Sequence, residues 1–284
     1  MTVDLHAAVD GWSPEPLEST ETIGSWPTAA FSALLELPGP AAIDEEPLPP
    51  GWHWFHFLEP TRLSDLGDDG HPGAGRFLPP IPDRRRMIAG GRLHVRSPIL
   101  LGDTITRRTE LASVVVKDGR SGQLAFVTTR TVFRRGAEIL VAEEQDVVYR
   151  SQPAGVQRAP AAAEPEPVPD HDWQTATRTT PQLLFRFSAL TYNTHRIHYD
   201  QPYVTGVEGY PGLVVHGPLL ALLLLEIPRR MLRRRVARFD YRLSSPVFCG
   251  ATVLTHGRST ERGLTLSAMA EGGRTSITGR ASLT

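Results

Sequence analysis

The chain has little cysteine, almost no net charge and no long apolar run. Cys249 is the only thiol among 284 residues, so the chain can form neither an internal disulfide nor a cysteine-rich metal centre. The formal net charge is −1 and the isoelectric point is near 6.8. Because the charges nearly cancel, nucleic acid or a membrane surface is not expected as the main partner.

Signals for membranes, secretion and cofactors are also missing. The longest uninterrupted apolar run, Leu219–Leu225, is far too short to cross a bilayer. The first residues, Met1–His6, lack the basic and apolar segments of a secretory signal. The sequence has no Walker phosphate loop and no glycine-rich dinucleotide turn, and His195 with His198 alone is a weak metal motif. We therefore expect a cytoplasmic protein without a resident cofactor or metal.

An internal repeat organises the rest of the sequence. Ser97–Ile105 and Ser245–Val253 share the pattern Ser-Pro-apolar-apolar-x-Gly-x-Thr-apolar without a gap. Segments with alternating apolar and polar residues, typical of β-strands, flank both copies: 91–96, 105–116 and 123–132 in the first half, and 238–243, 252–258 and 264–270 in the second. Each half is therefore expected to form its own antiparallel sheet.

The two halves are separated by residues 151–172, which contain five prolines and no periodic pattern. We predict one unit at 1–150, a Pro/Ala-rich linker at 151–172 and a second unit at 173–284. With 40% hydrophobic residues, the chain can bury a sizeable core.

One main helix is predicted for each half. Pro218–Ile227 is apolar nearly all round and must be buried, and Thr28–Leu37 is the best helix of the first half. Trp52–Leu58 is predicted to be a strand, and the Gly- and Pro-rich stretch 59–86 a loop over the surface or a pocket. A single antiparallel sheet can hide its apolar face by wrapping around a helix, and two such sheets can join edge to edge. The expected fold class is α+β.

Residues suited to acid–base chemistry gather after the apolar run 183–190. His195 and His198 supply two imidazoles, whose ordinary pKa lies near neutrality. Soon afterwards Gly217 and Pro218 open the buried helix, whose first turn offers free backbone N–H groups and a positive dipole end. Proton transfer and oxyanion stabilisation are therefore both available.

Each of these residues also has a purely structural interpretation. His195 could be a solvated or capping residue, and Asp200, just before Gln201 and Pro202, is better suited to cap a short helix than to act as an acid. His216 could orient a substrate or only cap the helix. Gly217 could serve as a simple helix entry.

Several segments together resemble a known family. They are similar to type 2 hydroxyacyl-thioester dehydratases and mesaconyl-CoA (3-methylfumaryl-CoA) hydratases, within the MaoC-like, double hot-dog group. The segments that carry the resemblance are Phe187–Asp200 and Val215–Leu219 in the second half, and Gly51–Trp54, Phe77–Pro80, Arg85–Arg92 and Val116–Gly122 in the first.

The resemblance implies two hot-dog units, each a sheet wrapped around a central helix, joined as one continuous sheet. It also implies addition or removal of water across the α,β double bond of an acyl thioester, on coenzyme A or on acyl-carrier protein. Such relatives often associate further, so a homodimer is expected. The acyl chain and the direction of the reaction stay open.

The family motif, Asp-x-Asn-Pro-x-His-x-Asp, can be laid onto this chain residue by residue. His198 takes the His position, but Asn193 stands in the place of the catalytic Asp and His195 in the place of the Asn. Because asparagine cannot act as a general base, we expect His198 to transfer the proton and Asn193 to hold the water. The resemblance further implies that the Gly217 N–H stabilises the enolate, and that His195 or Tyr199 supports the pocket.

Two arginine-rich runs are candidates for contacts to coenzyme A phosphates, because Arg matches phosphate oxygens with paired donors. They are 84–86, with Arg85 and Arg86 as the expected substrate contacts, and 229–235. A solvated surface or a capped helix end is the structural alternative. Two other functions remain open: an acyl-CoA thioesterase using the same pocket, and a non-catalytic subunit that binds acyl thioesters.

Overall fold

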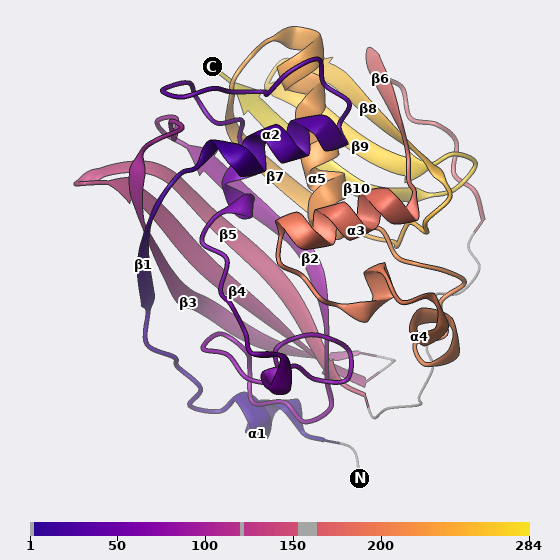
Figure 1. Ribbon diagram of the computed structural model, residues 1–284. Coiled ribbons are helices and arrows are strands. Elements are labelled where there is room, and N and C mark those ends of the chain that lie inside the picture. Colours follow the sequence, from indigo (N-terminus) through magenta and orange to yellow (C-terminus); the bar gives the residue numbers. More distant parts are fainter. Residues whose placement is uncertain (1–2, 120–121, 153–163) are drawn as a thin grey trace.

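The protein is built on one antiparallel sheet of ten strands. The computed structural model describes residues 3–119, 122–152 and 164–284 (Figure 1). The strand order is β1-β3-β4-β5-β2-β7-β10-β9-β8-β6. The strands are β1 Leu17–Thr22, β2 Arg84–Val95, β3 Thr104–Gly119, β4 Gly122–Arg135, β5 Glu138–Ser151, β6 Trp173–Arg178, β7 Val236–Leu243, β8 Thr252–Thr260, β9 Gly263–Ala270 and β10 Thr275–Leu283.

The helices are few and short. They are α1 Leu5–Val9, α2 Ser25–Leu34, α3 Pro181–Leu190, α4 Gln201–Gly206 and α5 Gly217–Glu226, with single 3₁₀ turns at Trp52–Phe55, Leu63–Asp65 and Arg196–His198 and a π-helical turn at Ile227–Leu232. Within the described residues, none of the helices has the length and apolar character needed to cross a membrane.

The two halves follow the same path, which confirms the repeat. The first half runs β1-β3-β4-β5-β2 from its outer edge, and the second runs β6-β8-β9-β10-β7, so that β2 and β7 meet at the centre. After β2 and after β7, the Ser-Pro segments turn into the next strand at a left-handed glycine, Gly102 with φ 89° or Gly250 with φ 97°. The N–H groups of these glycines donate to equivalent carbonyls, those of Ile23 and Thr179. The double hot-dog expectation is confirmed.

The central helix is long only in the second half. Residues Leu219–Glu226 of α5 are all buried, and α5 contacts β8, β9 and β10. Figure 1 shows α5 behind the neighbouring helices α2 and α3, which pack on each other. The repeat aligns the two halves at this point. The Leu48 N–H donates to the Ile99 carbonyl, and the Val215 N–H donates to the carbonyl of Val247, the repeat equivalent of Ile99. Residues 49–50 of the first half therefore correspond to His216 and Gly217. A single 3₁₀ turn follows there in place of a second α5.

The strand predicted at Trp52–Leu58 is wrong, because this segment begins with a 3₁₀ turn. Gly51 is left-handed, with φ 85°, and its α-carbon lies so close to Leu222 of α5 that a Cβ would come within 2.8 Å. Trp52 and Phe55, three residues apart, both pack on Phe31, with ring centroids 4.8 and 4.7 Å away. The aromatic side chains therefore form core contacts through a turn rather than through a pleated strand.

Other predicted elements are close to the observed ones. Helix α2 begins at Ser25, three residues before the predicted start, and Pro27 lies in its first turn, where proline is tolerated. Strand β2 begins at Arg84, so the loop predicted at 59–86 ends slightly earlier. Residues 153–163 of the predicted linker lie outside the described residues, and the domain division stays a prediction.

The junction between the halves depends on a glycine. An added Cβ at Gly90 of β2 would lie 2.3 Å from the Tyr241 carbonyl oxygen of β7. We predict that Gly90→Ala lowers the free energy of unfolding by about 1–3 kcal/mol, because overpacking forces the paired strands apart. Urea unfolding measures this. Gly212→Ala, whose Cβ would meet nothing within 4 Å, is the control, and equal stability of the two variants would contradict the prediction.

Candidate active site

The site is built on the connection between α3 and α5. After α3, the Asn193 N–H donates to the Ser188 carbonyl (2.8 Å), and the chain turns into the 3₁₀ turn that carries His198. Asp200 caps α4 by accepting from the Tyr203 N–H, as the sequence predicts, and it also pairs with Arg196 (2.8 Å). Asp200 is therefore fully engaged in holding the turn.

His198 is a buried imidazole with a fixed tautomer. Its Nδ1 lies 2.7 Å from the Val214 carbonyl oxygen. Because a carbonyl only accepts, Nδ1 carries the hydrogen and Nε2 keeps its lone pair. Burial lowers the pKa of His198 to about 4, against the raising effect of the bond to Val214. At neutral pH His198 is thus an uncharged base.

His216 packs directly on His198. The two rings are stacked, with centroids 3.6 Å apart and an interplanar angle of 19°. His216 Nε2 lies 2.9 Å from the Ser188 hydroxyl, and its Nδ1 is buried without a hydrogen-bond partner among the described residues. Burial, and then the proximity of His198, lowers the pKa of His216 well below 6.5. Its side chain does not cap α5, so the capping alternative is wrong.

Gly217 is the first residue of α5 and directly follows His216. The first N–H groups of a helix have no carbonyl one turn earlier to accept them, and Pro218 has no N–H. An added Cβ at Gly217 would lie 2.8 Å from a methyl group of Leu243, so the backbone is closely packed here. The positive end of a buried helix dipole therefore lies beside the two stacked imidazoles.

Asn193 and His195 precede His198 in the same turn of the chain. The Asn193 Oδ1 accepts from the His195 backbone N–H at 2.9 Å, which identifies its amide oxygen and leaves Nδ2 as the donor on the other side. The His195 ring stands edge-on to His198, with centroids 5.4 Å apart. Burial lowers the pKa of His195 well below 6.5, and the charges of its neighbours act in the same direction.

The sequence analysis did not identify a loop of the first half that completes the site. The His71 ring lies on the His195 ring, 3.8 Å between centroids, and its Nδ1 is 3.1 Å from Asp69 Oδ2. Burial lowers the pKa of His71 to about 4 despite that bond. Burial alone would raise the pKa of Asp69, but the hydrogen bonds from His71 and the charge of Arg85 lower it to about 2.

This loop is bound to the histidine motif itself. The Thr194 hydroxyl donates to the Gly70 carbonyl (2.6 Å), and the Arg196 N–H donates to the Asp69 carbonyl (2.9 Å). A Cβ at Gly70, which has φ 83°, would lie 1.9 Å from the Thr194 carbonyl oxygen. Only glycine allows this approach. Atoms of Asp69, His71 and His195 lie within 4.8 Å of one another, but the hydrogen bonds between Asp69 and His71 already account for the arrangement without an ion.

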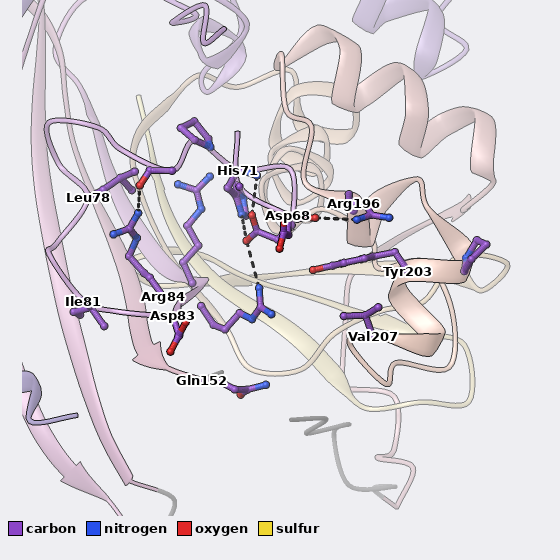
Figure 2. Close-up of a pocket in the computed structure, with 17 residues that line it drawn as sticks. Asp68, His71, Leu78, Ile81, Asp83, Arg84, Gln152, Arg196, Tyr203 and Val207 are labelled. Carbon is purple, nitrogen blue, oxygen red and sulfur yellow. Dashed lines mark hydrogen bonds and ion pairs between the residues drawn. The ribbon is translucent and has the colours of Figure 1, made fainter. Parts of the chain in front are cut away.

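A cavity of about 780 Å³ opens beside His71. Figure 2 shows its walls, formed by the 67–73 loop, the start of β2 and the start of α4. The cavity is lined by Arg85 and Arg86, as the sequence predicts for substrate contacts. His198 does not line it but lies behind the rings of His71 and His195.

The remaining sequence candidates lie elsewhere. Tyr199 is 44% exposed, its hydroxyl donates to the Thr194 carbonyl, and it is not part of the cavity wall. The arginine run 229–235 lies at the opposite end of α5 from Gly217, beside a second cavity of about 400 Å³, where Arg229 pairs with Glu226. Ten helical residues, roughly 15 Å, separate the two ends, so only the 84–86 run is near the histidines.

Comparisons with known proteins agree with this geometry. Residues 51–249 match the family described as hydroxyacyl-thioester dehydratase type 2. A mesaconyl-C(4)-CoA hydratase from Chloroflexus aurantiacus is 48% identical over 220 residues, covering 77% of this chain and 78% of that protein. A MaoC-like dehydratase from Phytophthora capsici has a similar structure, with a TM-score of 0.70 at 16% identity over 99% of both chains. A Mycobacterium tuberculosis protein with a double hot-dog fold has a TM-score of 0.58 at 16% identity, covering 96% of both chains.

The two solved structures share the fold, and the sequence match extends over both the 67–73 loop and the histidine motif. The chain therefore belongs to the hydroxyacyl-thioester dehydratase type 2 family, and it is a hydro-lyase that adds water to, or removes it from, the α,β bond of an acyl thioester.

Proposed function

We propose that the substrate is the coenzyme A thioester of a short, branched, unsaturated dicarboxylic acid of the 3-methylfumaryl (mesaconyl) type. The name of the 48% identical relative supports this substrate class and the coenzyme A carrier. The observation that carries the mechanism is the tautomer of His198, whose Nδ1–H is held by Val214 and whose Nε2 is a free base. A cytoplasmic location stays an expectation.

In the proposed reaction, His198 both removes and returns one proton. Asn193 Nδ2 holds the water, His198 Nε2 takes a proton from it, and the oxygen bonds to the β-carbon. The π electrons move to the thioester oxygen as an enolate, which the Gly217 N–H stabilises. His198 then delivers the proton to the α-carbon and is neutral again. A single such amide donor typically lowers the barrier by about 3 kcal/mol.

This cycle requires no carboxylate base, which explains how Asn193 can replace the motif's Asp. A thioesterase would need a carboxylate as base or nucleophile. Among the candidate carboxylates, Asp69 is hydrogen-bonded to His71, Asp200 is engaged with Arg196 and the start of α4, and Glu226 is paired at the far end of α5. Hydration is therefore the better supported reaction, and release of free thiol from the substrate, measured in the same assay, would favour the thioesterase instead.

The roles of His198 and Asn193 can be separated by substitution. We predict that His198→Ala lowers kcat by roughly 10²–10⁴, because the base is lost, and that Asn193→Ala costs less, because only a water contact is removed. Asn193→Asp should keep or raise activity, since a carboxylate oxygen can also accept from the His195 N–H. The assay is the loss of enoyl-thioester absorbance. Near wild-type turnover of a folded His198→Ala variant would exclude this mechanism.

The pH dependence follows from the lowered pKa of His198. A base is active when deprotonated, so kcat/KM should be constant through neutrality and fall only as the pH approaches about 4. An ordinary imidazole would give the fall near its unperturbed pKa of about 6.5. Initial rates measured from pH 8 downwards, with circular dichroism at each pH to verify folding, distinguish the two. An acid limb centred near 6.5 would contradict the assigned environment of His198.

A homodimer is a separate prediction about assembly. Light scattering should give twice the mass of the single chain. A strict monomer would remove this expectation without affecting the fold or the chemistry.

A further inference from the structure

Four arginines line the cavity beside His71. Two of them donate hydrogen bonds to groups of the protein, and a third, Arg85, is paired by charge although its Nε is buried without a hydrogen-bond partner among the described residues. Arg84 donates to the carbonyls of Pro79 and Gly73 at 2.9 and 2.8 Å. Arg196 pairs with Asp200 and donates to the Asp68 carbonyl. Arg85 lies 3.9 Å from Asp69 and 3.7 Å from Glu208, so its charge is balanced by two carboxylates.

Arg86 differs from these three. Within the described residues, no carboxylate oxygen lies within 4.0 Å of its guanidinium, and the neighbouring groups that favour its charged form are Tyr149 and, from farther away, Asp69. Arg86 and Tyr149 are cross-strand partners in the β2–β5 register, and Tyr149 is only 3% exposed. Burial raises the pKa of Tyr149, so this partner is a neutral phenol. The guanidinium therefore has no carboxylate in direct contact within the described residues, and the charge of Asp69 acts on it only from a longer distance.

The charge of Arg86 acts on the two histidines that precede His198 in the chain of ring contacts. After burial, it is among the causes that lower the pKa of His71 and of His195. Burial is also the largest effect on Arg86 itself and lowers its pKa, although an arginine stays cationic in proteins. An unpaired cation in a partly desolvated wall is costly unless an anion binds to it.

We propose that Arg86 binds the free carboxylate of the acyl group and thereby selects dicarboxylic substrates. This inference rests on the proposed function. In a 3-methylfumaryl thioester the free carboxylate is bonded to the β-carbon, the carbon that water attacks. Its receptor must therefore lie on the histidine side of the cavity. Arg86 lines the same cavity as His71, and its charge acts on both His71 and His195, whose ring contacts His198. Guanidinium and carboxylate can form two parallel hydrogen bonds, which fix the β-carbon in position. Tyr149 acts as a positioning residue for Arg86.

Binding of unreactive thioesters tests recognition separately from catalysis. Succinyl-CoA carries a free carboxylate on the β-carbon, and butyryl-CoA carries a methyl group there. By calorimetry, the wild type should bind succinyl-CoA more tightly, and Arg86→Met should weaken succinyl-CoA binding on the order of 100-fold while changing butyryl-CoA binding less than about threefold. Arg86→Lys, which keeps the charge but loses the paired donors, should fall between them.

Two further variants test whether the effect is specific to Arg86 and whether Tyr149 supports it. Arg92→Met changes an arginine of the same strand that pairs with Glu144 and Asp146 and does not line the cavity, so it should leave the succinyl preference unchanged. Tyr149→Phe should reduce the preference about threefold to tenfold, because Arg86 loses its anchor. Retained butyryl-CoA binding shows that each variant is folded.

Measurements of turnover show whether the role of Arg86 or the proposed substrate class is wrong. We expect the wild type to hydrate 3-methylfumaryl-CoA in preference to 3-methylcrotonyl-CoA, and Arg86→Met to lose that preference. If the wild type prefers the dicarboxylic substrate and Arg86→Met keeps the preference, Arg86 is not the receptor. If Arg86→Met weakens both ligands equally, its role is structural and the inference is also wrong. If the wild type shows no preference for the dicarboxylic thioester, the proposed substrate class itself is wrong.

Discussion

Antiparallel pairing between β2 and β7 is the contact on which the rest of the molecule depends. It joins two repeats into one sheet and leaves β2 continuous with the loop that precedes it. Because β2 begins at Arg84, the 67–73 loop and the 84–86 arginine run lie beside the histidine motif of the second half. Neither half contains a complete site: the second supplies the proposed base and helix amide, and the first supplies most of the cavity wall.

Burial determines the protonation state of the histidines in this site. Four imidazoles lie in ring contact in a chain from His71 to His216, and burial is the largest cause of the lowered pKa of each. Kept neutral, they act as acceptors and packing surfaces rather than as charges. Positive charge is concentrated instead on the arginines of the cavity wall, which is the arrangement expected for an anionic substrate and an uncharged base.

The sequence predicts those parts that carry a local signal. The repeat, most of the alternating strands and the buried helix could be read from short patterns, whereas the roles proposed for His198 and Gly217 rest on the family resemblance. Strands β1, β5, β6 and β10 were not predicted. The edge strands β1 and β6 are six residues long with alternating exposure, and such segments resemble a polar loop. The aromatic segment after Gly51 was wrongly predicted to be a strand, because aromatic residues favour strands. Its packing in the core instead stabilises a turn. Asp69 and His71 gave no signal, because the histidine motif that they contact lies more than a hundred residues away. A run of three arginines likewise does not reveal which one lacks a counter-ion.

The first repeat carries Pro49 and Pro50 where the second carries His216 and Gly217. Proline has neither an imidazole nor a backbone N–H, so the two features that the catalytic copy needs are removed together, and a short 3₁₀ turn replaces the long helix. On the proposed mechanism, each chain therefore has one catalytic centre. Changes in the first repeat can then alter the shape and charge of the cavity wall without altering the proposed base and helix amide.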